Sequence, residues 1–239
     1  MRYNVNGVEV RSENAAKPAS SAGRWMLDWI SNLEPRGAGL DLGCGKLRYT
    51  VHLAKRLSYV TAVDSREQVN RTQRLFGSDC SVREYAARHL ANVHIYAIEE
   101  DDWRQSRYSV ILCSNVLSAI PCLETRRGLV RAAYDQLCPG GEFLLTTQYR
   151  NSHFTSWQTN PRAKRFLDGF LVEHSRCVSF YGMIDSTALA KLCRRVGFTV
   201  VRSGHAKELA YVFATRASAS PQLVSSKAAS LQPAIQIAV

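Results

Sequence analysis

The sequence has no apolar run long enough to cross a bilayer, and its first residues lack the apolar segment of a secretory signal peptide. No membrane span and no secretion are therefore expected. Paired cysteine spacing is missing too: the seven cysteines include no Cys-x-x-Cys pair, which disulfide frameworks and structural zinc sites favour. The pattern predicts reduced, mostly buried thiols in a cytoplasmic protein without a metal site.

Acidic residues are scarce relative to basic ones. The chain holds 20 Asp and Glu against 31 Lys and Arg, which gives a formal net charge of +11. A basic surface attracts phosphates, so RNA stays open as a partner. The basic residues are spread from Lys46 to Lys207 without a dense cluster, however, and scattered charge is typical of a solvated surface.

The length of 239 residues and the 46% hydrophobic content suffice for one sizeable core. We expect an N-terminal arm and helix over residues 1–36 that could act as a lid. A Rossmann-like domain is predicted over 37–215, with a cap-like insert at about 150–182. Residues 216–239 are small and polar, with no acidic residue, and are expected to be a disordered tail.

Short apolar runs alternate with helical segments along the first two thirds of the chain. Strands are expected at 39–42, 59–63, 93–97, 109–113 and 142–147, and helices from near Ser20 to Pro35 and at 50–56, 65–75 and 125–137. Such alternation favours a doubly wound α/β fold, in which helices cover both faces of a mostly parallel sheet.

The last part of the chain departs from this alternation. Residues 185–196 predict a helix that ends at Gly197, and residues 198–202 and 209–214 predict two strands joined by a short link. A short link cannot form a parallel crossover, so this pair should be antiparallel. The prediction is a seven-stranded, mostly parallel sheet with an antiparallel last strand.

The segment Leu40-Asp41-Leu42-Gly43-Cys44-Gly45-Lys46 carries the strongest functional signal. A glycine turn directly after a buried strand lets a ligand approach the backbone closely. Asp64, at the end of the next predicted strand, could accept hydrogen bonds from both hydroxyls of a ribose. The two features together predict a nucleoside-containing ligand at the carboxyl ends of the strands.

Two types of nucleoside cofactor compete for this site. Dinucleotide-binding enzymes need a third glycine for close helix–strand packing, and this chain has Arg48 there. A carboxylate at Asp41, two positions before the first glycine, suits a ligand that carries an ammonium and a sulfonium group. The residues therefore disfavour NAD.

The segment Asp41-Leu42-Gly43-Cys44-Gly45 resembles the first motif of class I S-adenosylmethionine-dependent methyltransferases, and Asp64 resembles their second. Residues 111–121 are similar to the fourth-strand segment of the small-molecule, ubiquinone-biosynthesis-like branch. Residues 137–141 resemble the turn before the fifth strand. Gly197-Phe198 with two closing strands resembles the antiparallel sheet edge, so the resemblance covers roughly residues 37–215.

This resemblance implies S-adenosylmethionine as cofactor and a role for each matching residue. It places the methionine part on the backbone of Gly43 and Gly45, the ammonium near Asp41 and the ribose at Asp64. The expected cofactor-binding set is Asp41, Gly43, Cys44, Gly45, Asp64, Ser65, Glu99, Glu100 and Asn115, with Glu99, Glu100 or Asp101 near the adenine amine and Asn115 in the methyl-transfer pocket. Two positions depart from the family pattern: Leu47 replaces a frequent glycine, and Ile98-Glu99 replaces a Gly-Asp pair.

The insert is the most individual part of the chain. Its aromatic residues, interspersed with basic ones, are Phe154, Trp157, Phe166, Phe170, Phe180 and Tyr181. They could stack a planar acceptor, although a small helical cap with its own apolar face is the interpretation we favour. The candidates for a catalytic base are His153, Tyr181 and Tyr149, with His174 nearby.

The resemblance implies methyl transfer to a small acceptor, planar or anionic, at oxygen or nitrogen. Two alternatives remain: an RNA methyltransferase, and a non-catalytic partner or sensor that binds S-adenosylmethionine. Methylation of DNA amino groups is disfavoured because Ser114-Asn115-Val116-Leu117 stands where such enzymes carry an Asn/Asp-Pro-Pro-aromatic segment.

Overall fold

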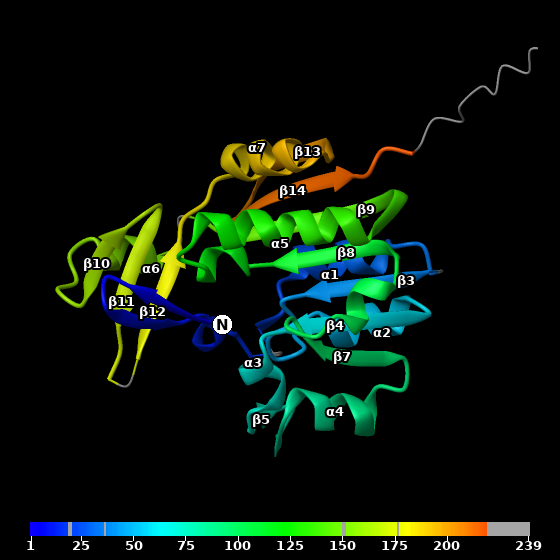
Figure 1. Ribbon diagram of the computed structural model, residues 1–239, viewed down its shortest axis with the longest axis horizontal. Coiled ribbons are helices and arrows are strands. Elements are labelled where there is room, and N and C mark those ends of the chain that lie inside the picture. The colour runs from blue at the N-terminus through cyan, green and yellow to red at the C-terminus, as the bar shows by residue number, and fades with distance from the viewer. Residues whose placement is uncertain (19–20, 36, 150–151, 176, 219–239) are drawn as a thin grey trace, which may run out of the picture.

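The computed structural model describes residues 1–18, 21–35, 37–149, 152–175 and 177–218 (Figure 1). Its central sheet has seven strands in the order β13-β14-β9-β8-β3-β4-β7. Their bounds are β3 Ala38–Leu42, β4 Tyr59–Asp64, β7 Val93–Ala97, β8 Tyr108–Ser114, β9 Leu137–Gln148, β13 Thr199–Ala206 and β14 Leu209–Thr215. The first five are mutually parallel, whereas β14 pairs antiparallel with both β9 and β13. The predicted fold class is confirmed.

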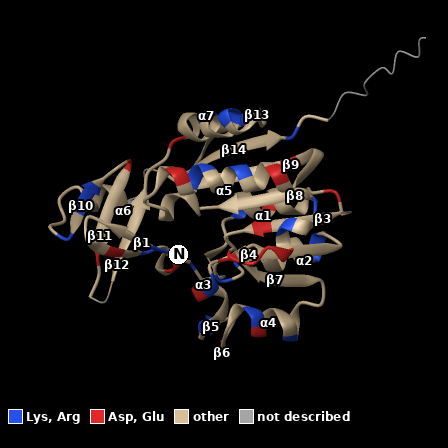
Figure 2. Ribbon diagram, viewed as in Figure 1, with Lys and Arg blue, Asp and Glu red and all other residues tan. Residues whose placement is uncertain are grey.

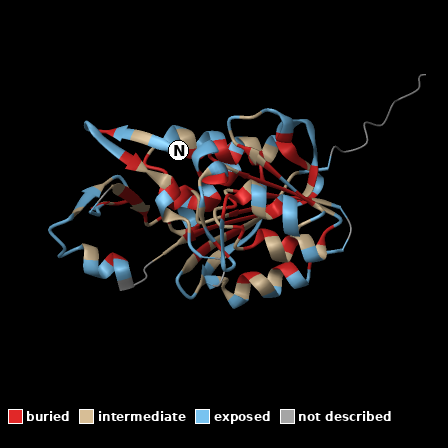
Figure 3. Cartoon of the chain, turned by 90° about the horizontal axis from the view of Figure 1, so that it is seen from below, coloured by how far each residue is buried: buried red, intermediate tan, exposed pale blue. Residues whose placement is uncertain are grey.

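Two hydrophobic cores lie on opposite faces of this sheet. Ile111 and Cys113 of β8 pack into the core formed with helices α5 (Leu123–Gln136) and α7 (Ser186–Val196). Their neighbours Val110 and Leu112 pack into the core on the other face, which is formed with α1 (Arg24–Ser31), α2 (Thr50–Arg56), α3 (Arg66–Asn70) and α4 (Val82–His89). Successive side chains of a strand point to opposite faces of the sheet. A strand made of a continuous apolar run is therefore buried on both faces (Figure 3).

The chain order places a crevice at the carboxyl end of β3. The chain leaves β3 through α2 toward β4, and it leaves β8, the neighbour on the other side, through α5 toward β9. Helices on opposite faces therefore diverge between β3 and β8, which is where ligands bind in sheets of this kind. The register aligns Leu42 with Val63, so Gly43 and Asp64 leave the sheet side by side.

The segment after β4 differs from the prediction. Helix α3 ends at Asn70, and the predicted continuation to residue 75 is wrong because β5 (Gln73–Leu75) and β6 (Ser78–Cys80) form a hairpin there. Helix α4 was not predicted. Its start nevertheless carries a recognisable signal, a capping box between Ser81 and Glu84 in which each side chain bonds the other's backbone amide.

A second sheet covers the carboxyl edge of the first. Its order is β1-β2-β12-β11-β10, with bounds β1 Arg2–Val5, β2 Val8–Arg11, β10 Ala163–Phe166, β11 Gly169–Glu173 and β12 Val178–Gly182. The N-terminal hairpin joins the insert through the parallel pair β2–β12, in which Val10 aligns with Val178. We call these five strands the cover sheet.

The cover sheet corrects the predicted helical cap. Only α6 (Ser152–Trp157) is helical in the described part of the insert, and its other regular elements are the strands β10, β11 and β12. The N-terminal arm is a β-hairpin with Asn6-Gly7 in the left-handed region at its turn, a frequent hairpin signal. Phe180 is fully buried against Val5 and Val10, so the insert obtains part of its core from the other end of the sequence.

Buried arginine Arg126 attaches the cover sheet to the core. It projects from α5 and donates to both carboxylate oxygens of Asp168, in the turn between β10 and β11, at 2.5 and 2.9 Å. Its Nε donates to the carbonyl of Ile120 at 2.8 Å. The Arg126 side chain is only 4% exposed, against 34% for Asp168, so the pair is shielded mainly on the arginine side.

All seven cysteines are free, and Cys44, Cys80, Cys113 and Cys193 are buried. In the described part of the chain, no helix is both long and apolar enough to cross a membrane. The predicted disordered tail begins at residue 216, and its residues 219–239 lie outside the described residues.

Replacing Arg126 by glutamine should lower the free energy of unfolding by about 2–3 kcal/mol, because a buried pair loses one partner and Asp168 keeps an uncompensated charge. Urea unfolding measures this. The neighbouring Arg127 is exposed on the same helix, and Arg127→Gln should change stability by less than about 0.5 kcal/mol. Equal effects of the two substitutions would contradict the proposed attachment.

Candidate functional site

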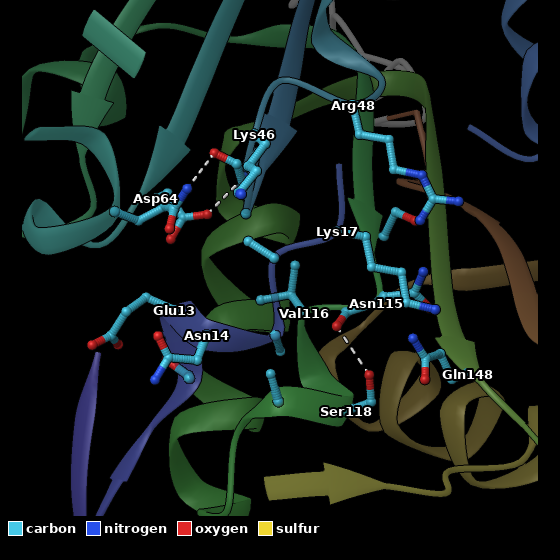
Figure 4. Close-up of a pocket in the computed structure, with 18 of the residues that line it drawn as sticks. Glu13, Asn14, Lys17, Lys46, Arg48, Asp64, Asn115, Val116, Ser118 and Gln148 are labelled. Atoms are coloured by element: carbon cyan, nitrogen blue, oxygen red, sulfur yellow. Dashed lines mark hydrogen bonds between the residues drawn. The ribbon is translucent and has the colours of Figure 1, made fainter. Parts of the chain in front are cut away.

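A cavity of about 500 Å³ lies where the crevice meets the cover sheet (Figure 4). Most of its lining comes from the glycine turn after β3, the loop after β8, the N-terminal segment 12–18 and side chains of the insert, with single residues from β4, α3 and β9. The predicted residues that it brings together are Asp41, Gly43, Cys44, Gly45, Asp64, Asn115, His153 and Tyr181. Ser65, Glu99, Glu100 and Tyr149 are not among its lining residues.

The glycine turn approaches the neighbouring loop too closely for a side chain. A Cβ on Gly43 would lie 2.1 Å from Cγ2 of Val116, and the backbone φ of 90° is one that other residues rarely adopt. The amides of Gly43 and Cys44 donate to the carbonyl of Val63 at 2.7 and 3.0 Å. The turn is thus held against β4 with its open side toward the cavity.

Asp64 fixes this turn from the end of β4. Its Oδ2 accepts a bond from the Gly45 amide at 2.8 Å, and its Oδ1 accepts one from the Ser65 amide at 2.7 Å. The Nε2 of Gln68 donates to the Gly45 carbonyl at 2.7 Å, so both backbone groups of Gly45 are occupied (Figure 4). Gln68 lines the cavity and was missed from the sequence, where its only signal is its place one helical turn beyond Asp64.

Leu47, the departure from the family glycine, adopts the backbone conformation that glycine favours. Its φ is 61°, which costs a leucine on the order of 1–2 kcal/mol. The side chain is fully buried in the core beside α2, and burial of a leucine stabilises by about 1.5–3 kcal/mol. Packing of the Leu47 side chain therefore offsets the backbone strain. The turn keeps the left-handed backbone conformation that a glycine would adopt at this position.

Asp41 is a buried carboxyl group on the floor of the cavity. The residue is 3% exposed, and its Oδ2 accepts a bond from the Thr50 hydroxyl at 2.6 Å. Burial raises the pKa of Asp41 to about 7, the Thr50 bond lowers it in part, and the charge of Asp64 raises it further. A cation entering the cavity would favour the ionised form.

Asn115, which follows β8, places a side-chain oxygen without a hydrogen-bond partner among the described residues at the cavity. Its backbone φ is 62°, its amide donates to the carbonyl of Thr146 at 2.8 Å, and its carbonyl accepts from the Ser118 hydroxyl at 2.9 Å. The side-chain Oδ1 is buried without a hydrogen-bond partner among the described residues. Buried polar atoms in native proteins are mostly paired, so this one is suited to meet a ligand.

The residues predicted for an adenine lie beyond Asp64, outside the cavity lining. Glu99 accepts a bond from the Arg66 amide at 3.0 Å, one residue from Ser65, whose hydroxyl caps α3. Glu100 pairs with Arg83 at 2.6 Å and accepts a bond from the Ala97 amide at 2.8 Å. Of the two acids, Glu99 is the one that bonds the backbone of the segment directly after Asp64.

The insert supplies an aromatic wall to the cavity, made of His153, Trp157, His174 and Tyr181. The ring centroids of Trp157 and Tyr181 are 4.5 Å apart, and those of His153 and Trp157 are 5.9 Å apart. Burial raises the pKa of Tyr181 further above its ordinary value, which disfavours a role as a base and favours that of a hydrogen-bond donor. Tyr149 instead packs its ring 4.4 Å from that of His205 on β13.

A family model described as a methyltransferase domain matches residues 18–203. Uncharacterized protein YmfD of Escherichia coli (strain K12) is 37% identical over 212 residues, which cover 89% of this chain and 95% of that protein. The ubiquinone biosynthesis O-methyltransferase of Xanthomonas axonopodis pv. citri (strain 306) is 25% identical over 142 residues. That match covers 58% of this chain and 55% of the relative, about half its length.

A solved structure with the same fold is that of the Burkholderia thailandensis 1,6-didemethyltoxoflavin-N1-methyltransferase with bound 1,6-didemethyltoxoflavin and S-adenosylhomocysteine. The TM-score is 0.57 at 19% identity, and the alignment covers 83% of this chain and 79% of the other. This likeness establishes the fold alone.

The raised pKa of Asp41 should make the free protein less stable as pH rises toward neutrality. The folded form keeps a proton up to about pH 7, whereas the unfolded carboxyl loses it near its usual 3.8. The stabilisation is therefore complete below pH 3.8 and is lost as pH rises through about 7, by at most about 1.4 kcal/mol per pH unit.

Urea unfolding between pH 5 and 8 measures this slope, and Asp41→Asn should make it shallower. Asp28, an exposed carboxyl on α1, offers the matched control Asp28→Asn, which should leave the slope unchanged. An Asp41→Asn variant with the wild-type slope would show that another group is responsible.

Proposed function

The chain belongs to the methyltransferase domain family, and from that premise we propose that it transfers a methyl group from S-adenosylmethionine to a small-molecule acceptor, at oxygen or nitrogen. The resemblance to class I S-adenosylmethionine-dependent methyltransferases is confirmed, and S-adenosylmethionine is the cofactor. The acceptor class and the roles of individual residues belong to the proposal.

The described residues fit this cofactor. Asp64 retains lone pairs for the ribose hydroxyls beyond its two amide bonds. The backbone of Gly43, Cys44 and Gly45 would face the methionine part, where a Cβ on Gly43 would not fit. Asp41 suits the ammonium end because a nearby cation stabilises its ionised form.

The adenine end and the transfer point follow from the same placement. Ser65 and Glu99, with Glu100 behind them, border the site beyond Asp64 and would face the adenine. Asn115 would face the transferred methyl group, since its unpartnered oxygen lies between the glycine turn and the insert. The cofactor supplies an electrophilic methyl group on a cationic sulfur.

The observation that favours a small acceptor is the partial enclosure of the cavity. The N-terminal segment lies over the glycine turn, where Ala16 is within 3.4 Å of the position of a Cβ on Gly45, and the aromatic wall lines the same cavity. Concave sites of this size suit small molecules. Lys and Arg are meanwhile scattered over α2, α4, α5, α7 and β10 (Figure 2). No single basic stripe marks a track for RNA along these elements.

Methyl transfer is an in-line displacement, so the protein's main tasks are to orient the acceptor and to exclude water. Trp157 and Tyr181 would hold a planar acceptor by stacking. His153, which lines the cavity as His174 does, would take a proton from a hydroxyl or ammonium acceptor. Tyr181 would donate a hydrogen bond to the acceptor. Tyr149 does not line the cavity and would act only indirectly, from behind the aromatic wall.

Titration calorimetry with S-adenosylmethionine, and with NADH as control, tests the cofactor first. Micromolar binding of S-adenosylmethionine alone is expected. Radioactive methyl transfer to a panel of hydroxylated and aminated ring compounds, alongside bulk RNA, then tests the acceptor class. Transfer to RNA and to none of the ring compounds would refute the small-molecule proposal and favour the alternative.

Asp64→Ala should weaken binding of S-adenosylhomocysteine by about 1–3 kcal/mol, because charge-assisted bonds to the ribose are lost. Calorimetry gives the difference directly. Glu67→Ala removes an exposed carboxylate from the adjacent helix α3 and should leave the affinity unchanged. Unaltered affinity in the Asp64 variant would refute the ribose assignment.

A further inference from the structure

The cavity holds basic side chains that lack carboxylate partners. Lys17, Lys46 and Arg48 line it, and none of them has a carboxylate of the described residues within 4.0 Å. Three acids also line the cavity: Asp41 and Asp64 accept bonds from the Thr50 hydroxyl and from backbone amides, and Glu13 pairs with the N-terminal ammonium of Met1 at 3.2 Å. Among the described residues, no acid that lines the cavity therefore forms an ion pair with Lys17, Lys46 or Arg48.

Arg48 is the most constrained of these cations. One terminal nitrogen donates to the carbonyl of Ser21, and the guanidinium lies 4.9 Å from the centroid of the Tyr49 ring. Its Nε is buried without a partner among the described residues. The residue is half-buried, and this burial lowers the pKa of Arg48. An unpaired donor on a desolvated cation is costly unless an anion meets it.

Lys17 lies close enough to Arg48 for the two charges to repel. Burial lowers the pKa of Lys17, and the charge of Arg48 lowers it further. The charge of Glu208 acts in the opposite direction, but more weakly and without an ion pair. Figure 4 shows both side chains beside Asn115, on the other side of the cavity from Asp64. The two cations thus face one end of the cavity.

We propose that Lys17 and Arg48 form a subsite for an anionic group, a carboxylate or a phosphate, on the methyl acceptor. This inference rests on the proposed function and narrows its substrate class. The pair lies beside Asn115, where the methyl group would be transferred, and near Gln148, another lining residue.

The aromatic wall indicates a second feature of the acceptor, a planar ring. Trp157 and Tyr181 line the same cavity as the cation pair, so one ligand can stack on the rings and place an anion at the two charges. The acceptor that fits both features is a planar ring bearing a carboxylate or a phosphate. Lysine supplies a point charge and arginine a flat fork of donors, a combination that suits either group.

Binding of matched probes to protein saturated with S-adenosylhomocysteine tests this inference. The probes are 2-naphthoate against the nearly isosteric 2-naphthamide, which differ mainly in charge, and 2-naphthyl phosphate against 2-naphthol, which lacks the phosphate. Calorimetry should show at least one anion binding about tenfold or more tightly than its neutral counterpart. The pair that shows the preference identifies the carboxylate or the phosphate.

Lys17→Met and Arg48→Gln should each reduce that preference by about tenfold while leaving the affinity for S-adenosylhomocysteine unchanged within twofold. Arg48→Lys should retain part of it. Lys191, exposed on α7, offers the control Lys191→Met, which should keep the full preference.

Three outcomes are decisive against the inference. Equal binding, or no binding, of both probes in each pair would exclude an anionic acceptor subsite while leaving the proposed function intact. Weaker binding of S-adenosylhomocysteine in the Lys17 and Arg48 variants, with the anion preference retained, would assign the cations to the cofactor's own carboxylate. Failure of wild-type protein to bind S-adenosylhomocysteine would remove the proposed function and this inference with it.

Discussion

The carboxylate of Asp64 is the contact on which the site depends. It accepts a bond from the Gly45 amide, and Gln68 donates to the Gly45 carbonyl, so the glycine turn is fixed to the end of β4 by one backbone group and to α3 by the other. The network continues outward, because Arg71 donates to Oε1 of Gln68 at 2.6 Å and to the carbonyl of Glu13 at 3.0 Å. The floor of the cavity and the N-terminal segment that covers it are therefore held by one connected set of bonds.

The cover sheet makes the two halves of the cavity interdependent. The hairpin β1–β2 and the insert are separated in sequence by the five parallel strands of the central sheet, yet they share strand pairing and the small core around Phe180. Arg126 bonds both the turn at Asp168 and the carbonyl of Ile120, which lines the cavity. The aromatic wall of the cavity is thus positioned by contacts that also position the loop after β8.

Local patterns explain which elements could be predicted. The central strands are continuous apolar runs buried on both faces, so their positions follow from composition alone. The Asn6-Gly7 turn and the Ser81–Glu84 capping box were readable signals that were overlooked. The strands of the insert carried no such signal, since exposed and buried positions mix irregularly along β10 to β12 and their partner strand comes from the N-terminus.

The order of residues along the chain was enough to predict the doubly wound sheet and to bring Asp41, Gly43, Gly45 and Asp64 together, because they lie at or next to the ends of adjacent strands. The side of the cavity proposed for the acceptor became visible only in the folded protein. Lys17, Arg48, Gln148 and Trp157 line one cavity because strand pairing and an ion pair join distant segments. The spacing of residues along the chain does not predict such contacts, because they depend on which surfaces bury one another when the chain folds.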